Sequence, residues 1–401
     1  MQREPLGETG PAGVDRVLEL LAHLVALPTE SRTSNRELIE WTADHLRTFG
    51  AEVSIIDGDP GRANLLATVG PVGSGGVLLS GHTDVVAAGE GWATPAYEMT
   101  RVELTAGPGV AGRGTADMKG FIACVLATIE VFDGSTLARP VHLALSYDEE
   151  VGCVGVRSLL DQLADGASHG AVRPDLVMIG EPTMMRPRHA HLGKVAYRLD
   201  FQASAAHSSL SPFLPGAIGS AARIIAALEA VAEPHRSTAT RDASGEPSAD
   251  VSVNVGTIHG GTALNVLADR CEITFELRHT TAFDPDRLLE PVWAAVERER
   301  VTLGDVGGGV EIEEITRYPA LMTDRTADVV AVVERLADRG QSVPVGFGTE
   351  GGLFAAAVPA PVVICGPGDI GVAHRPDEHV SIEQLQACLA FLPRLIDALC
   401  R

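Results

Sequence analysis

Short apolar segments alternate with amphipathic segments along most of the chain, and this alternation restricts the fold more than any other feature. The segments 77–80, 141–147 and 176–180 have the composition of buried strands, and 118–132 and 154–163 have helical periodicity. Strands and helices in regular alternation are typical of an α/β layer with a largely parallel sheet. We therefore expect an α/β fold with a mostly parallel central sheet.

The pattern of predicted elements changes after about residue 187, where strand-like runs become longer and more frequent. A chain of 401 residues exceeds the length at which one hydrophobic core usually stops growing. We therefore expect two domains, one of them inserted into the other. The expected boundaries are 1–186 for the first part of the α/β domain, 187–296 for the insert and 297–401 for the second part.

Composition excludes several classes of function. The formal net charge of −22 argues against a nucleic-acid partner, because phosphate contacts require a basic face that no segment supplies. No apolar run approaches the ~20 residues that a bilayer span needs, and the first residues lack the apolar region of a secretory signal. We therefore expect a cytoplasmic protein without a membrane partner. Its six scattered cysteines, which include no C-x-x-C pair, fit reduced and mostly buried thiols.

The motif Gly-His-Thr-Asp at 81–84 directly follows the apolar run 77–80. Side chains repeat every two residues along a strand, so His82 and Asp84 should point to the same side. A histidine there can bind a metal, and the aspartate carboxylate can accept a hydrogen bond from the imidazole nitrogen that the metal does not use. Taken alone, His-Thr-Asp at 82–84 is more readily interpreted as a polar strand end with no catalytic or metal-binding role.

Two further acidic sites lie at predicted boundaries. Asp117 ends a glycine-rich loop at the start of a helix, where it is either a metal ligand or only an N-cap. Asp148, Glu149 and Glu150 follow the strand 141–147. Neighbouring residues at a strand end point in different directions, so one glutamate can bind a metal while the other acts as a general base. A solvated acidic turn is the alternative.

Glu181 follows the strand 176–180, and His374 follows the strand 361–365. Five metal-competent groups therefore each follow a predicted strand, and the carboxyl ends of parallel strands are where sites assemble in α/β sheets. Three carboxylates and two histidines suit zinc, with cobalt or manganese as alternatives. One shared carboxylate allows two metals about 3.5–4 Å apart.

In this order the motifs resemble those of a known enzyme family. They are Ser-Gly-His-Thr-Asp, Gly-Arg-Gly-Thr-x-Asp-Met-Lys-Gly, Tyr-Asp-Glu-Glu-Val-Gly, Gly-Glu-Pro-Thr and Ala-His-x-Pro-Asp-Glu. The set resembles the co-catalytic zinc hydrolases that include acetylornithine deacetylase, succinyl-diaminopimelate desuccinylase, aminoacylase and carboxypeptidase G2. The resemblance spans about residues 15–400. It looks closest to the acetylornithine deacetylase subfamily through the stretches 146–153, 181–187 and 366–370.

Matched by position, the resemblance implies a site for two Zn²⁺ ions, with Co²⁺ as a possible substitute. It implies that Asp117 bridges the two metals and that the peptide bond after it is cis. His82 and Glu181 would complete one metal site, and Glu150 and His374 the other.

The same resemblance implies catalytic roles for three further residues. Glu149 would be the general base, and Asp84 would hold His82. The insert resembles the family's α+β, ferredoxin-like lid or dimerisation domain, in which His207 matches a histidine that stabilises the oxyanion, often from the partner subunit of a homodimer. The family positions that face substrate correspond to Asn265, Arg278, Gly348 and Thr349. A solvated loop histidine and ordinary turn chemistry are the alternatives for the residues of the insert.

The implied activity is metal-dependent hydrolysis of the N-acyl amide of a small amino acid. N-acetylornithine, cleaved to ornithine and acetate in arginine biosynthesis, is the first choice. Succinyl-diaminopimelate desuccinylation is the second, and a broader aminoacylase or carboxypeptidase the third. Ala116, where close relatives often have cysteine, and the unusual run 348–352 weaken the choice of substrate. A metal-binding regulatory protein is the alternative from another class of function. Such proteins usually lack the general base or one of the metal ligands, whereas the base and all the ligands are present here.

Overall fold

The computed structural model describes residues 13–165, 172–236, 240–241 and 247–401. The chain divides into two compact units, each with its own hydrophobic core. The first unit comprises Met1–Ala190, Thr323–Pro344 and Thr349–Arg401. The second unit comprises His191–Met322 and Val345–Gly348.

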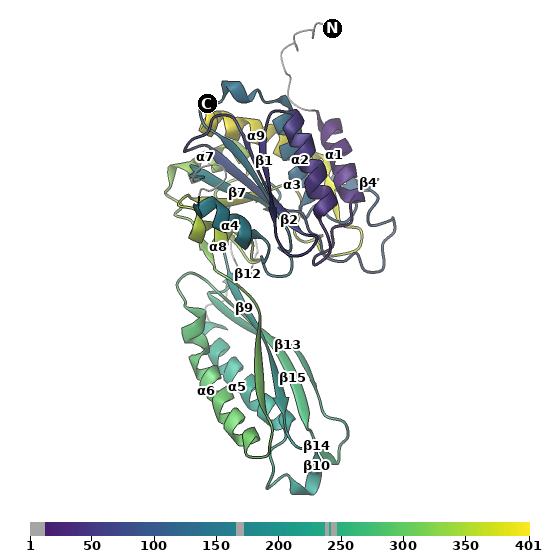
Figure 1. Ribbon diagram of the computed structural model, residues 1–401, viewed down its shortest axis with the longest axis vertical. Coiled ribbons are helices and arrows are strands. Elements are labelled where there is room, and N and C mark those ends of the chain that lie inside the picture. Colours follow the sequence, from purple (N-terminus) through teal and green to yellow (C-terminus); the bar gives the residue numbers. More distant parts are fainter. Residues whose placement is uncertain (1–12, 166–171, 237–239, 242–246) are drawn as a thin grey trace. The chain divides into compact units, whose positions relative to one another are not determined.

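A mixed sheet with a parallel centre runs through the first unit (Figure 1). Its strands follow one another in the order β1, β2, β6, β3, β7, β19 and β8, and β18 pairs with β8. The neighbours β6 and β3, β3 and β7, and β7 and β19 are parallel, which confirms the predicted α/β fold. The strands are β1 Glu52–Asp57, β2 Ala63–Val69, β3 Val77–His82, β6 Val141–Ser146, β7 Leu176–Pro182, β8 Arg188–His191, β18 Val343–Val345 and β19 Val362–Gly366.

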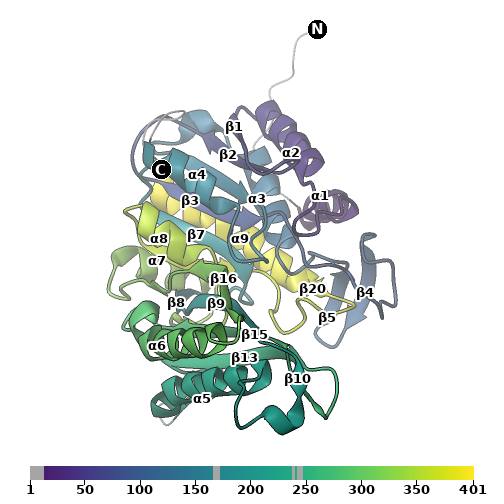
Figure 2. The same ribbon diagram turned by 60° about the horizontal axis from the view of Figure 1, so that its bottom comes forward.

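Helices cover both faces of this sheet (Figures 1 and 2). Leu65 and Leu79 join the core that α1, α2, α3 and α9 form. Because strand side chains alternate, Leu66 and Leu78 point to the other face, where α4 and α8 pack. No helix in the described part of the chain has the length and apolar character of a membrane span. The helices are α1 Val14–Ala26, α2 Arg36–Thr48, α3 Lys119–Val131, α4 Val156–Asp165, α7 Asp328–Ala337, α8 Gly351–Ala357, α9 Ile382–Cys400 and the 3-10 turn η1 Gly134–Thr136.

Helix α3 is apolar on nearly all sides because it is enclosed, packing against α1, α9 and the sheet. Its one buried cation, Lys119, donates to the carbonyl oxygens of Leu24 and Leu27 at 3.0 and 2.9 Å and so satisfies the C-terminal end of α1. On β7, Gly180 leaves room for the ring of Phe121, since a Cβ there would lie 2.0 Å from a ring carbon. These contacts hold the start of α3 close to the end of β7.

A small three-stranded sheet joins two loops that are far apart in the sequence. It consists of β4 Thr100–Leu104, β5 Gly107–Ala111 and β20 His379–Ser381, in the order β20, β5, β4. Ala111 at the end of β5 is paired with His379 at the start of β20. The segment that follows β5 and the segment that precedes β20 therefore leave this sheet side by side.

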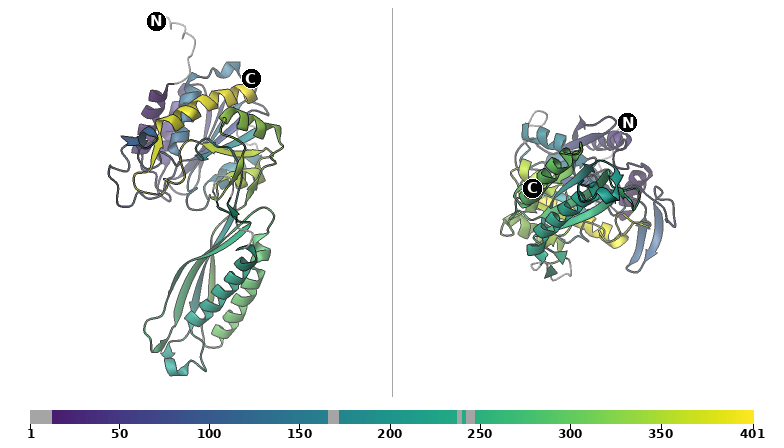
Figure 3. Two further views of the ribbon diagram at one scale, coloured as in Figure 1. Left: turned by 180° about the vertical axis from the view of Figure 1, so that it is seen from behind. Right: turned by 90° about the horizontal axis from the view of Figure 1, so that it is seen from below.

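The second unit is an α+β layer with the connectivity β-α-β-β-α-β (Figure 3). Its four long strands lie in the order β13, β15, β9 and β16, all antiparallel, which is the ferredoxin-like arrangement. Alternate residues of β9 and β15 pack against α5 and α6. Its elements are β9 Gly193–Gln202, β10 Ala206–His207, η2 Ser208–Leu210, α5 Ala217–Arg236, β11 Thr240–Arg241, β12 Pro247–Ser248, β13 Val251–Gly260, β14 Val266–Leu267, β15 Arg270–His279, α6 Pro285–Gly304, β16 Gly309–Tyr318 and β17 Leu321–Met322.

The second unit extends further than the insert of 187–296 expected from the sequence. It begins at His191 and continues to Met322, with a further segment at Val345–Gly348. The difference arises from β16, which pairs with β9 from Gly309 to Tyr318 and completes the ferredoxin-like sheet. Sequence analysis identified no strand there because three of its residues are glutamates and half of the strand is exposed.

Candidate metal centre

Strand ends bring polar residues together at one edge of the sheet in the first unit. The parallel register runs from Val77 opposite Val141 to His82 opposite Ser146. His82 therefore ends β3 beside the end of β6, where the chain continues directly into Glu149 and Glu150 after two residues. The neighbouring strand β7 carries Glu181 at its own carboxyl end. This is the edge at which sites form in parallel α/β sheets.

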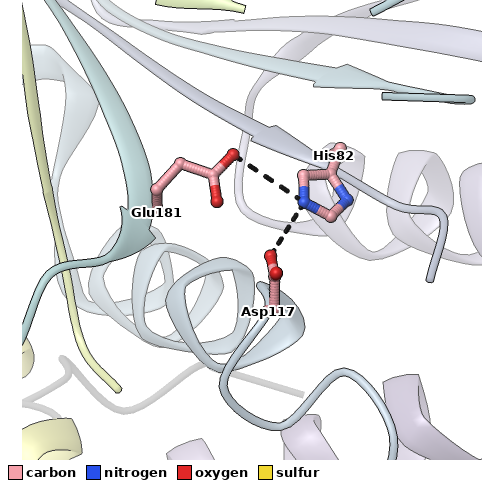
Figure 4. Close-up of side chains that lie close together, drawn as sticks. All are labelled: His82, Asp117 and Glu181. Carbon is pink, nitrogen blue, oxygen red and sulfur yellow. Dashed lines mark hydrogen bonds and ion pairs between the residues drawn. The ribbon is translucent and has the colours of Figure 1, made fainter. Parts of the chain in front are cut away.

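His82, Asp117 and Glu181 form the first group able to hold a metal (Figure 4). His82 Nε2 lies 3.0 Å from Asp117 Oδ1 and 3.8 Å from Glu181 Oε1, and all three side chains are buried. Burial disfavours protonation of the imidazole, but the carboxylates of Asp117, Glu181 and Asp84 outweigh it and raise the pKa of His82 well above its usual value. The group presents one nitrogen and carboxylate oxygens to a common point.

Asp117, Glu150 and His374 form the second group. His374 Nε2 lies 3.2 Å from Asp117 Oδ2 and 2.9 Å from Glu150 Oε2. The two oxygens of Asp117 thus face different histidines, His82 with Oδ1 and His374 with Oδ2. The peptide bond from Asp117 to Met118 is cis, as the resemblance implied. One carboxylate is shared by two groups, which is the arrangement expected of a bridging ligand.

The carboxylate of Asp84 does not make the hydrogen bond to His82 that the sequence predicted. His82 Nδ1 lies 2.8 Å from the backbone carbonyl oxygen of Asp84 but 3.6 Å from its carboxylate. The carboxylate instead accepts from the backbone N–H groups of Glu149 and Glu150, at 3.0 and 3.3 Å, and from the hydroxyl of Ser31 at 2.8 Å. Main chain therefore orients the imidazole, and the aspartate side chain holds the turn that carries the two glutamates.

Glu149 lies at the centre of a tight turn. Its carbonyl oxygen accepts from the N–H groups of Gly152 and Cys153, and the Cys153 thiol donates to its carboxylate at 3.3 Å. Burial raises the pKa of Glu149 well above its usual value, as is required of a carboxylate that has to accept a proton. The preceding Asp148 points elsewhere, because it pairs with Arg62 and accepts from the N–H of Arg32.

Three consecutive carboxylates repel one another when they are charged, and in this turn each of them has a different partner. Asp148 takes an arginine, Glu149 a thiol and Glu150 a histidine. Only Glu150 belongs to a group able to hold a metal. Glu149 belongs to neither group, which is consistent with a division between ligand and base.

Glu350 is a buried carboxyl that sequence analysis did not identify. Its exposed fraction is 1%, and its Oε1 has no hydrogen-bond partner among the residues that the structure describes. Burial raises the pKa of Glu350 to about 7. A charged residue within an otherwise small and apolar run, Gly-Thr-Glu-Gly-Gly-Leu-Phe, was the signal that could have revealed it. The adjacent Thr349, expected to face substrate, is buried, and its hydroxyl accepts from the N–H of Gly351 at the start of α8.

The remaining predicted residues lie in the second unit. His207 on β10 is exposed, with its Nδ1 2.9 Å from the hydroxyl of Ser209. The next residue, Ser208, donates its N–H to the carbonyl oxygen of the exposed Asn265 at 3.0 Å, so His207 and Asn265 lie close together. Arg278 on β15 is half-buried and donates to Glu276 at 3.0 Å. Gly348 packs against Tyr318, whose hydroxyl oxygen would lie 2.2 Å from an added Cβ.

The donor chemistry of the two groups fits divalent cations. Burying three carboxylates together is costly unless cations or hydrogen-bond donors face them. Two imidazoles and three carboxylates are nitrogen and oxygen donors, the set that borderline metals such as zinc accept. The described residues therefore provide two groups able to bind metal ions, with Asp117 common to both.

Comparison with known sequences identifies relatives that cover nearly the whole chain. A family described as peptidase family M20/M25/M40 matches residues 78–398. Acetylornithine deacetylase of Pasteurella multocida (strain Pm70) is 32% identical over an alignment of 396 residues, which covers 96% of this chain and 98% of that protein. Acetylornithine deacetylase of Proteus mirabilis (strain HI4320) is 31% identical over 397 residues, 96% of each chain.

Solved structures share the fold at lower sequence identity. An M20 family metallo-carboxypeptidase from Sulfolobus solfataricus has a TM-score of 0.75 at 16% identity, covering 95% of this chain and 98% of that one. A tripeptidase from Staphylococcus aureus gives 0.73 at 19%, covering 97% and 99%. A dinuclear metal-binding peptidase of the M20 family from Bacillus subtilis gives 0.63 at 15%, covering 96% and 97%.

The shared position of Asp117 makes metal content a direct test of the centre. We expect Asp117→Asn to lose most of its bound metal, because the change weakens a donor that belongs to both groups. Plasma mass spectrometry of the purified proteins would measure this loss. The control is Asp133→Asn, which alters an exposed carboxylate that accepts hydrogen bonds from the N–H and hydroxyl of the nearby Ser135 and should keep the parental metal content. An Asp117→Asn protein with parental metal content would contradict the assignment.

Proposed function

The chain belongs to peptidase family M20/M25/M40 and is a metal-dependent amidohydrolase, and we propose that it hydrolyses N-acetylornithine to ornithine and acetate, a step of arginine biosynthesis. The observation that carries this proposal is the shared Asp117 between two metal-competent groups, with Glu149 adjacent to the ligand Glu150. The choice of substrate is supported by relatives named acetylornithine deacetylase that are about 30% identical over nearly the whole chain.

The proposed cofactor is a pair of Zn²⁺ ions, with Co²⁺ as a possible substitute. His82 and Glu181 would hold one ion, Glu150 and His374 the other, and Asp117 both. When bound, such ions lower the pKa of water and polarise the carbonyl of the amide to be cleaved. The dinuclear relative from Bacillus subtilis supports a pair rather than a single ion.

Glu149 is the proposed general base. In amide hydrolysis the attacking water has to lose a proton, and the departing nitrogen has to gain one. A carboxylate of raised pKa can accept the first proton and return it to the amine. The hydrogen bonds from the N–H groups of Glu149 and Glu150 to Asp84 fix the backbone of this turn. The hydrogen bond from the Cys153 thiol fixes the carboxylate of Glu149, so that the proton is transferred at a defined position.

The second unit is proposed to supply the oxyanion donor and the contacts of a homodimer. His207 is exposed, and so are Leu210 and Phe213 beside it in the chain and Leu264 next to Asn265. Exposed apolar side chains in one region are a common mark of a protein interface. Among the residues described, β13 pairs along one edge only, with β15, so its other edge is available to a second copy. We propose that His207 stabilises the negative charge that develops on the substrate carbonyl oxygen.

A panel of substrates tests the proposed activity. N-acetylornithine should give the highest kcat/KM, above N-acetylmethionine, N-acetylcitrulline and N-succinyl-diaminopimelate, measured by release of the free amine. A clear preference for the succinylated substrate would make the chain a desuccinylase, and similar values for all four would make it a broad aminoacylase. Hydrolysis of none of them by the metal-loaded protein would contradict the proposal.

Replacing the base should separate catalysis from metal binding. Glu149→Gln keeps the shape of the side chain but cannot accept the proton, so kcat should fall by about 10²–10⁴-fold. The metal content should stay at the parental value, since Glu149 belongs to neither metal group. Glu130→Gln is the control, because Glu130 is a largely buried glutamate of α3 that pairs with Arg16. Unchanged turnover in Glu149→Gln would remove this residue from the mechanism.

Subunit mixing tests the role of His207. His207→Ala should lose roughly 2–4 kcal/mol of transition-state stabilisation with metals retained. If the histidine acts on the partner's site, a mixture of His207→Ala and Glu149→Gln proteins should regain activity. The heterodimer would contain one site with an intact Glu149 from one chain and an intact His207 from the other. Exchange of subunits shown by mass spectrometry without recovery of activity would mean that His207 does not act across a dimer.

A further inference from the structure

Glu378 is a buried glutamate that belongs to neither metal group yet contacts the loop of Asp117. It lies four residues after His374 and directly before β20, and its exposed fraction is 1%. Its Oε1 accepts from the backbone N–H groups of Ala116 and Asp117, at 2.9 and 3.0 Å. One carboxylate oxygen therefore binds the N–H groups of the two successive peptide units that lead into Asp117.

The other carboxylate oxygen of Glu378 is neutralised by a buried arginine. Oε2 lies 2.7 Å from Arg113 Nη1, and both side chains are 1% exposed. The guanidinium lies over the ring of Trp92, 5.1 Å from its centroid, and its Nη2 faces the carbonyl oxygens of Ala87 and Ala88 at 3.4 and 3.3 Å. Arg113 Nε alone has no hydrogen-bond partner among the residues that the structure describes. A buried pair of this kind is costly to break because one charge is then left uncompensated.

The main chain of Glu378 holds the same loop at its beginning. Its carbonyl oxygen accepts from the N–H of Gly112 at 2.9 Å and from the hydroxyl of Thr115 at 3.3 Å. The pairing of Ala111 with His379 immediately precedes these contacts. A single residue therefore fixes the loop 112–117 from its start at β5 to Asp117.

The same pattern of hydrogen bonds occurs at the turn that carries Glu149 and Glu150. Asp84 accepts from the consecutive N–H groups of Glu149 and Glu150, as Glu378 accepts from those of Ala116 and Asp117. In both cases a buried carboxylate that is not a ligand anchors two successive amides of a turn that carries a ligand. Charged acceptors make such hydrogen bonds stronger than neutral ones.

We propose that Glu378 is a positioning residue that sets the orientation of Asp117 between the two metals, and this inference rests on the proposed metal centre. Anchoring the two amides fixes the peptide plane and so the direction of the Asp117 side chain, whose two oxygens face His82 and His374. Because Glu378 and His374 share one loop, the contact also fixes the distance between two ligands of the second group.

Metal affinity and a spectrum of the bound metal test this proposal. Glu378→Gln keeps the shape of the side chain but weakens its acceptor strength and places an amide NH2 group against donors. We expect metal affinity to fall by about 10–100-fold in a competition with a chelator, the range found for residues that orient ligands. In the Co²⁺-substituted protein the visible absorption bands should shift, because the position of the bridging carboxylate changes.

The matched control is Glu130→Gln, which removes a half-buried carboxylate of α3 that pairs with Arg16 of α1 in the same unit. It should lower the midpoint of thermal unfolding without changing metal affinity or the Co²⁺ spectrum. If Glu378→Gln lowers the midpoint but keeps parental affinity and spectrum, the role of Glu378 is structural only and the proposal is wrong.

A second variant covers the case in which Glu378→Gln does not fold. Glu378→Asp keeps a negative charge beside Arg113, so the variant should fold. Its carboxylate is withdrawn by one methylene from the N–H groups of Ala116 and Asp117, so its metal affinity should be lower than that of the parental protein. Parental affinity in this variant would also overturn the proposal. If the parental protein itself binds no Zn²⁺ or Co²⁺, the proposed function fails, and this outcome differs from the failure of Glu378 alone.

Discussion

The density of negative charge buried at one edge of a sheet is the constraint on which this structure depends. Five carboxylates converge there, those of Asp84, Asp117, Glu149, Glu150 and Glu181. Asp84, Asp117 and Glu181 are buried and Glu149 and Glu150 are half-buried, so water solvates them poorly and the fold has to supply donors or cations. Histidines face Asp117 and Glu150, backbone amides face Asp84, and the proposed metal pair would compensate the rest. The local architecture follows from distributing these partners among carboxylates that would otherwise repel one another.

Rigid elements place these partners with little freedom. The parallel register of β3 and β6 puts His82 beside the turn of Glu149 and Glu150, and an enclosed α3 fixes the helix start after Asp117. The pairing of β5 with β20 then holds the Asp117 loop next to the His374 loop. Ligands from five separate segments are thus each tied to a strand or helix, which suits a centre that has to keep its geometry when charge on it changes.

Residues with a local signal could be predicted from the sequence, and residues defined by tertiary contacts could not. His82, Asp117, Glu150, Glu181 and His374 each stand in a polar motif after an apolar strand, and the structure brings all five together. Glu378 and Arg113 stand in the same motifs as His374 and Asp117, but no local pattern indicates that these two residues pair across 265 positions of sequence. For Asp84, residue spacing predicted the correct side but not that its own carbonyl oxygen would be the nearer acceptor for His82. Similarly, β16 is a strand because β9 pairs with it, and its glutamate-rich composition hides this.

The ferredoxin-like unit has a property that concerns how the chain could be rearranged by evolution. Lys194 at the start of β9 pairs with Tyr318 at the end of β16, so the two ends of this long insertion lie side by side. Bringing the two ends of an inserted segment together costs conformational entropy. Here the folding of the insert itself brings its ends together, so the first unit does not bear that cost. A short surface loop of the first unit could therefore be exchanged for such a module, or the module for another with adjacent ends. Insertion of a complete folding unit explains how one chain can contain two separate hydrophobic cores while the strand order of each unit's sheet stays unchanged.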